Sequence, residues 1–130
     1  MVKSNFISET INSTIYWLPD SYSIPNDYEK STYLLPAYDE FIISYKDRTA
    51  IMQTAHHKKM VSSNGIFYPL IVSNGKVIGT WARTIKNDNM NLEMKLLQPA
   101  NNKIKKSIND AAEEFGKFLA KKVEIKYTSI

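Results

Sequence analysis

The chain has 130 residues, of which 43% are hydrophobic and 23% charged, and its formal net charge at pH 7 is +4. This length predicts one domain that buries its own core, and the absence of cysteine excludes disulfides and thiolate metal sites. No apolar run approaches the roughly 20 residues of a transmembrane helix, and residues 1–10 lack a signal-peptide core. We therefore expect a cytoplasmic protein that does not contact membranes.

The N-terminal segment predicts a hairpin followed by a linker. Two β-prone runs, residues 6–11 and 14–18, surround the dipeptide Asn12-Ser13 and are typical of a short β-hairpin. Residues 19–32 are rich in Pro, Asp, Asn and Ser, which favours a loop or linker. We therefore assign the hairpin and linker to residues 1–30.

Short elements are expected next. Residues 33–35 favour a strand that ends at Pro36. Residues 38–45 fit either a short helix or a buried strand, because a short apolar run does not distinguish them, and we assign the helix. Residues 55–61 predict a second short helix with Thr54 as its N-cap.

Residues 66–96 carry the clearest pattern, which is that of strands joined by tight turns. Residues 66–72 are apolar and β-branched, and Asn74-Gly75 is the strongest short hairpin signal because both turn positions need positive φ. We expect the return strand over residues 76–85 and a second turn at Asn87-Asp88. Residues 90–96 then alternate apolar and polar side chains, as a half-buried strand does.

Arg83 is out of place in this pattern, because strand alternation puts it on the core-facing row of Trp81. Either a bulge re-aims the arginine, or it lies at an open rim where its charge reaches solvent or a ligand. Gly79 predicts a bulge or a bulky neighbour. The register that underlies these expectations pairs Val72 with Val77, Leu70 with Gly79, and Tyr68 with Trp81.

The last third of the chain predicts a helix and a closing strand. An apolar stripe recurs every three or four residues, and Asn101 or Asn102 supplies the N-cap of a helix at about 102–121. Residues 123–127 alternate and favour a final strand. Residues 31–130 are thus predicted to form an α+β fold, a curved, mainly antiparallel sheet or partial β-barrel with a C-terminal amphipathic helix. The stripe consists of Ile104, Ile108, Ala111, Phe115 and Leu119.

Positive charge is concentrated in the middle of the chain. Residues 41–86 contain seven Lys or Arg and a single acid, Asp47, whereas residues 1–40 contain two Lys and six Asp or Glu. Such a basic block attracts phosphate over long range, although a solvated face of a mildly basic protein is the simpler interpretation. The candidate nucleic-acid contacts are Lys46, Arg48, His56, Lys58, Lys59, Asn74, Lys76, Arg83 and Lys86.

Other chemistries find less support in the sequence. His56 and His57 are adjacent, so on a helix they point about 100° apart and fit a shared metal poorly. Asp39 and Glu40 would support acid–base chemistry if burial separated their pKa values, but acids are also favoured where a helix begins. Four glycines form neither a phosphate loop nor a dinucleotide fingerprint. We expect no metal and no cofactor.

Five stretches in order support a family resemblance: Leu34-Leu35-Pro36-Ala37-Tyr38-Asp39-Glu40, Tyr45-Lys46-Asp47-Arg48, Asn64-Gly65-Ile66-Phe67, Asn74-Gly75-Lys76-Val77-Ile78-Gly79-Thr80-Trp81 and Arg83-Thr84. Over roughly residues 5–120 the chain resembles the C-terminal region of the bacterial winged-helix DNA-binding protein family that includes AlkZ-type and YcaQ-type DNA glycosylases. The resemblance implies tandem winged helices followed by a barrel-like β-rich domain. Residues 6–18 would then be the remnant of a last wing, and the Asn74-Gly75 hairpin would lie close to DNA.

The chain departs from this family in its glutamines. The resemblance implies a catalytic Gln-X-Gln or Gln-X-Asp motif in an N-terminal part, but the only glutamines here, Gln53 and Gln98, precede Thr54-Ala55 and Pro99-Ala100. We therefore expect a non-catalytic, DNA-associating module that binds duplex DNA weakly alone. The alternatives are a fragment of a repair glycosylase that works with the winged-helix part of its parent protein, an interaction or scaffold domain using Tyr16, Trp17 and Tyr22, and a small enzyme using Asp39 or Glu40.

Overall fold

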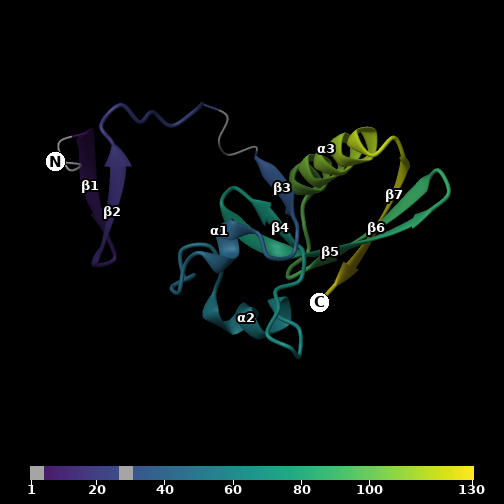
Figure 1. Ribbon diagram of the computed structural model, residues 1–130, viewed down its shortest axis with the longest axis horizontal. Helices are drawn as coiled ribbons and strands as arrows, with labels where there is room; N and C mark the ends of the chain where they lie inside the picture. The colour runs from purple at the N-terminus through teal and green to yellow at the C-terminus, as the bar shows by residue number, and fades with distance from the viewer. Residues whose placement is uncertain (1–4, 27–30) are drawn as a thin grey trace.

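The computed structural model describes residues 5–26 and 31–130. Within these ranges the chain forms a two-stranded sheet, β1-β2, and a five-stranded sheet in the order β3-β4-β5-β6-β7 (Figure 1). Residues 1–4 and 27–30 of the predicted hairpin and linker lie outside the described residues. The elements are β1 (Phe6–Ile11), β2 (Thr14–Pro19), β3 (Thr32–Leu35), α1 (Glu40–Ile43), α2 (Thr54–Met60), β4 (Leu70–Ser73), β5 (Lys76–Lys86), β6 (Asn89–Leu96), α3 (Asn102–Phe118) and β7 (Lys122–Ser129).

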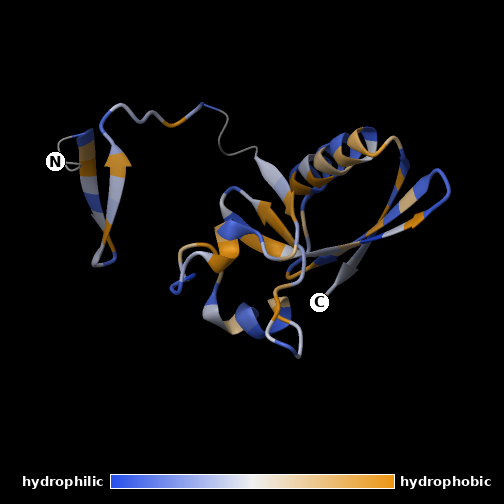
Figure 2. Cartoon of the chain, viewed as in Figure 1, coloured by the Kyte–Doolittle hydropathy of each residue, from blue (hydrophilic) through white to orange (hydrophobic). Residues whose placement is uncertain are grey.

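The N-terminal hairpin forms as predicted. β1 and β2 pair antiparallel around Asn12 and Ser13, whose φ angles of 49° and 66° are those of a tight hairpin turn. Apart from the half-buried Leu18, every residue of the two strands is exposed. Apolar side chains occupy both faces, and Figure 2 shows hydrophobic colour on both strands. A two-stranded hairpin of this kind is marginally stable on its own.

The predicted three-stranded unit is the centre of a larger open sheet. On β6 the buried residues Met90, Leu92, Met94 and Leu96 alternate with more exposed ones, as expected. β3 pairs with β4, and β7 pairs with β6 in the parallel direction after the α3 crossover. The fold is therefore α+β and mainly antiparallel. The edge strands β3 and β7 do not pair with each other in the described part of the chain, so these strands form no closed barrel.

A β-bulge shifts the predicted register by one residue. Val72 pairs with Val77 as expected, but the register slips between Ile71 and Val72, so Gly79 faces Ile71. The predicted pairs Leu70–Gly79 and Tyr68–Trp81 are therefore wrong: Leu70 pairs with Thr80, and the Trp81 N–H donates to the Pro69 carbonyl at 3.0 Å. Gly79 also permits a close strand approach, because a Cβ there would lie 2.2 Å from the Lys95 carbonyl oxygen.

Helix α3 covers one face of the sheet. Its N-cap is Asn101, whose side-chain oxygen accepts from the Ile104 N–H at 2.9 Å, and Ile108 and Ala112 are fully buried in the sheet core. The helix ends at Phe118, earlier than the predicted residue 121, because the chain turns at Ala120, with φ 52°, to begin β7. The amphipathic stripe thus orients α3, but the following strand determines its end.

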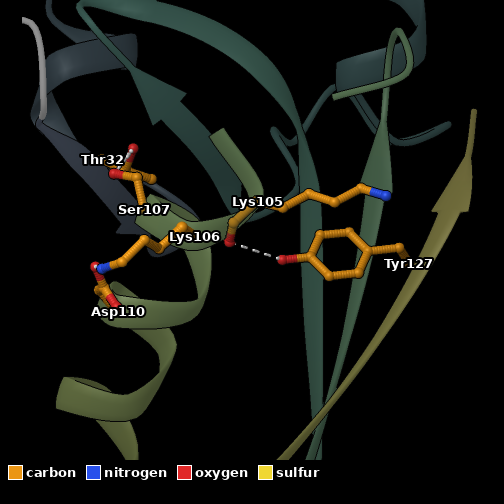
Figure 3. A network of polar contacts seen from close by, with 6 residues as sticks. All are labelled: Thr32, Lys105, Lys106, Ser107, Asp110 and Tyr127. Carbon is orange, nitrogen blue, oxygen red and sulfur yellow. Dashed lines mark hydrogen bonds and ion pairs between the residues drawn. The ribbon is translucent and has the colours of Figure 1, made fainter. Parts of the chain in front are cut away.

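Polar contacts tie α3 to both edges of the sheet (Figure 3). The Ser107 hydroxyl donates to Thr32 Oγ1 on β3 at 2.7 Å. On the other side, the Tyr127 hydroxyl of β7 donates to Asn109 Oδ1 at 2.6 Å and also contacts the Lys105 carbonyl at 3.4 Å. The helix therefore bridges the two edge strands β3 and β7.

The opposite face of the sheet packs against α1, α2 and their loops. Ile42, Met52 and Met60 form a second buried cluster with the β4 residues Leu70 and Val72, whose side chains point away from the α3 core. Within the ambiguous run of residues 38–45 only Glu40–Ile43 is helical, so the assigned helix forms but is shorter than predicted. The Asp39 carboxylate caps it by accepting from the Phe41 N–H at 2.9 Å. No helix in the described ranges is long and apolar enough to cross a bilayer.

The predicted cap of α2 is wrong, because the helix begins at Thr54 and its N-cap position is occupied by Gln53. The Gln53 side chain makes no capping hydrogen bond. Its carboxamide therefore takes no part in satisfying the free N–H groups of the first helical turn.

Candidate nucleic-acid interface

The predicted nucleic-acid contacts are spread along β5, and we divide them into a group around α2 and a group toward the end of the strand. Lys76 begins this strand and Lys86 ends it, which at about 3.3 Å per residue separates their backbones by roughly 33 Å in a straight strand. The basic block of the sequence is therefore not one compact patch. The first group, here named the α2 group, contains Lys46, Arg48, His56, Lys58, Lys59, Asn74 and Lys76; the second, the hairpin-tip group, contains Arg83 and Lys86.

Arg48 is the structural centre of the α2 group. Its Nε donates to the Ile42 carbonyl at 2.6 Å, and its guanidinium carbon lies 5.1 Å from the centroid of the Phe67 ring. The same ring meets His57 edge-on, with 5.3 Å between centroids. A cation stacked on an aromatic face is held in orientation. The interleaving of basic and aromatic residues in the sequence thus becomes a physical cluster around Phe67.

Asp47, the single acid of the basic block, is engaged within its own loop. Its carboxylate accepts the Thr49 N–H at 2.9 Å and the Thr49 hydroxyl at 2.7 Å. These two hydrogen bonds hold the pKa of Asp47 below its usual value. The ionised carboxylate shapes the loop that carries Lys46 and Arg48, while Lys58 and Lys59 are exposed on α2.

The two histidines face different surroundings, as their adjacent positions on a helix predict. His57 packs on Phe67 and lines a small hollow with Lys46 and Arg48. His56 lines a separate hollow together with Lys76. No group of three potential ligands among His, Cys, Asp and Glu surrounds either histidine within the described ranges.

The β4–β5 turn packs against neighbouring loops. Asn74 and Gly75 have the positive φ angles predicted for them, 51° and 73°. The Asn74 N–H donates to the Ser31 carbonyl at 3.0 Å, and the Lys76 ammonium donates to the Ala50 carbonyl. The family resemblance implies that the Asn74-Gly75 hairpin lies close to DNA, whereas the long projecting hairpin of the structure is β5–β6 (Figure 1).

Arg83 lies on the exposed part of β5, with its guanidinium carbon 5.6 Å from the centroid of Phe115 on α3. The bulge is at Ile71 and Val72, away from this position. The sequence left two explanations for Arg83 on the core-facing row, a bulge that re-aims it or a position at an open rim of the sheet. The position at the open rim is therefore confirmed. The aliphatic part of the side chain covers the end of the core while the charged head stays in contact with water.

Two further lysines, Lys121 and Lys122, lie at the tip of the β5–β6 hairpin. The Lys121 ammonium donates to the Asn87 carbonyl at 2.9 Å and lies 3.8 Å from the Asp88 carboxylate. The Lys122 N–H donates to the Asp88 carbonyl at 2.8 Å. No local signal predicts this contact, because it depends on the parallel pairing of β6 with β7.

The acidic pair has a structural role. Asp39 caps α1, and Glu40 lies exposed in the first turn of that helix. The hollow of about 370 Å³ beside α2 is lined by neither carboxylate. The capping interaction accounts for an acid at this position without an acid–base function.

Comparisons with known proteins give one family match and one similarity of fold. A family model described as DNA glycosylase AlkZ-like matches residues 6–118. No curated protein sequence matches. Among solved structures, the fold is similar to that of Streptomyces sahachiroi DNA glycosylase AlkZ, with a TM-score of 0.67 and 13% sequence identity over 95% of this chain and 34% of that chain. The chain thus spans about a third of the AlkZ structure, and the likeness at this identity is one of fold.

Proposed function

We propose, because this chain belongs to the AlkZ-like DNA glycosylase family, that it is a non-catalytic module that associates with duplex DNA. In this proposal residues 31–130 hold the DNA, and the hairpin and linker of residues 1–30 connect the module to a winged-helix part. Removal of a damaged base would be carried out by that part, since the glutamines of this chain do not form the motif that the family resemblance implies.

The observation that supports this proposal is the presence of cations at both ends of β5. Lys59 lies beside the middle of the strand, where it lines a hollow with Thr80 and Ala82. Lys76 lies at the start of the strand, and Lys86 with Lys122 lies at its end. Their separation of roughly 33 Å along a straight strand is close to the roughly 34 Å of one turn of B-DNA. A duplex lying along β5 would therefore offer phosphates to both groups within about one helical turn.

The expected affinity is low and depends on salt. If the exposed lysines Lys46, Lys58, Lys59, Lys86 and Lys122 each neutralise one phosphate, the slope of log K against log salt is roughly −4.5. Between 50 and 200 mM salt the affinity then falls about 500-fold. Backbone contacts of this kind carry no base sequence information.

The test is a salt titration of binding to a 20-bp duplex by fluorescence anisotropy. The pairs Lys58→Gln with Lys59→Gln and Lys86→Gln with Lys122→Gln should each reduce the slope by roughly 1.8. A matched pair on α3, Lys103→Gln with Lys106→Gln, removes the same charge from another surface and should leave the slope unchanged. An 8-bp duplex, shorter than one turn, should show about half the wild-type slope. If both double variants kept the salt slope of the wild-type protein, the proposal would be refuted.

A second candidate, a protein-interaction domain, is favoured by the β1–β2 hairpin. Its side chains are exposed on both faces, and Tyr16, Trp17 and the following Tyr22 are 40%, 51% and 54% exposed. Exposed aromatic side chains of this kind are typical of contact surfaces for other proteins. If this is the main function, Trp17→Ser should abolish binding of a winged-helix partner while DNA binding stays absent or unchanged.

A further inference from the structure

The fold brings the two glutamines of the chain into one hollow. Gln53 at the start of α2 and Gln98 after β6 both line a hollow of about 370 Å³. His56 and Lys76 line it as well, and the hollow has no carboxylate in its lining. It therefore combines carboxamide groups, an imidazole and a cation in the basic part of the molecule.

Backbone hydrogen bonds hold the walls of the hollow in place. The Val77 N–H donates to the Ile51 carbonyl at 2.8 Å, which joins the loop before α2 to β5. The Leu97 N–H donates to the Ile78 carbonyl at 2.9 Å, which joins the loop after β6 to the same strand. Since both walls are tied to β5, the hollow exists before any ligand enters, as small-molecule sites generally do.

The lining has an apolar floor and a polar rim. Ile51, Ile78 and Ile104 supply the aliphatic surface, on which a flat ring can pack. Gln53 makes no capping hydrogen bond, and Gln98 is exposed at the edge. Each carboxamide offers two N–H donors and one acceptor oxygen, which is the arrangement that reads the donor–acceptor edge of a nucleobase such as adenine.

We propose that this hollow binds an unpaired nucleobase of DNA, with the base edge on the Gln53 and Gln98 carboxamides and the adjoining phosphate near Lys76. This inference rests on the proposed association with DNA, and it adds a preference for DNA in which a base is already extrahelical. The volume lies in the lower part of the roughly 300–1,000 Å³ range of small-molecule sites. Entry of a base requires unstacking, which costs least where the base is unpaired.

The test compares a perfect duplex, the same duplex with one bulged deoxyadenosine, and free dAMP. Wild-type protein should bind the bulged duplex about tenfold more tightly than the perfect one, as expected for one good carboxamide–base contact. Gln53→Leu and Gln98→Leu should each reduce this preference to less than twofold without changing the affinity for the perfect duplex. Asn91→Leu, which removes an exposed carboxamide on β6, should keep the preference. Thermal melting of the variants establishes that they are folded.

Each outcome bears on one proposal. Equal wild-type affinity for the two duplexes, or a preference that survives in both glutamine variants, overturns the nucleobase site and leaves duplex association standing. Binding of dAMP without preference for the bulge assigns the hollow to free nucleotides and also overturns the inference. If the protein does not bind the perfect duplex but still binds the bulged one in a way that depends on the glutamines, the nucleobase site is supported and general duplex association is refuted.

Discussion

Gly79→Ala tests the close packing of β5 against β6. An added Cβ would lie 2.2 Å from the Lys95 carbonyl oxygen and 3.1 Å from the Leu96 Cα, where ordinary contacts begin at 3.4 Å. Both neighbours are backbone atoms of β6, so β5 and β6 would have to separate locally by more than about 1 Å. Overpacking of this kind costs about 1–3 kcal/mol, and the loss of one ladder hydrogen bond adds about 1 kcal/mol.

The total of about 2–4 kcal/mol is a large part of the roughly 5–15 kcal/mol by which domains are stable. For a domain of this size we expect Tm to fall by about 10 °C, measured by circular dichroism together with the urea midpoint. Gly116→Ala is the comparison: its Cβ would lie 2.1 Å from the Val123 Cγ2, a side-chain atom, and 3.1 Å from the Lys121 carbonyl oxygen, so its shortest contact is not with backbone, and we expect a smaller loss of stability.

Gly75→Ala is the control for backbone strain without crowding. Gly75 has φ +73° and no atom within 4 Å of an added Cβ, so only the left-handed conformation opposes the substitution, at about 1 kcal/mol. If Gly79→Ala melted within about 2 °C of wild type, or no lower than Gly75→Ala, then close strand contact would not explain the glycine.

Three further predictions concern single side chains. Arg48→Ala removes the cation stacked on Phe67 and should lower stability in chemical denaturation by about 1–2 kcal/mol without changing the salt slope of DNA binding, because Arg48 is not among the side chains expected to neutralise phosphates. Lys46→Ala should instead lower the salt slope, measured by anisotropy, by roughly 0.9 without changing stability. Trp81→Phe deletes the Nε1 hydrogen bond of 2.9 Å to the Leu35 carbonyl and should cost about 1–3 kcal/mol in urea unfolding, whereas an unchanged midpoint would refute a role for this bond. Burial raises the pKa of Tyr127 above 10.0. The stabilisation that the neutral Tyr127 side chain gives the folded protein is therefore complete below the unfolded pKa and is lost as pH rises through the folded pKa. The free energy of unfolding, measured from pH 8 to 12, should fall less steeply in Tyr127→Phe than in the wild type.

Local patterns predict much of this fold because they report backbone geometry directly. Asn12-Ser13, Asn74-Gly75 and Asn87-Asp88 are all at turns, and their asparagines have positive φ. The alternation after residue 90 and the helical stripe after residue 102 identify β6 and α3, because each buries one side against the core. These signals need only near neighbours in the sequence.

Features that depend on distant parts of the chain are not visible in such patterns. The bulge at Ile71 and Val72 arises where β4 must pair with both β3 and β5, and it shifts the register of Gly79. The parallel β7 and the early end of α3 follow from the crossover that returns the chain to β6. For the same reason the sequence does not show that Lys121 contacts the β5–β6 turn, or that Gln53 and Gln98 share a hollow.

Net charge in a sequence window therefore says less about DNA contact than the position of each charge on the sheet. The basic block of residues 41–86 is continuous in sequence, yet β5 separates its last lysine, Lys86, from Lys76 at the start of the strand by roughly 33 Å along a straight strand. At physiological salt, charges are screened beyond about 8 Å. In the proposed complex the cations at the two ends of β5 would therefore attract separate phosphates independently of each other. Binding should consequently depend on duplex length in a way that total charge does not predict, because a duplex too short to reach both ends of β5 loses one group entirely.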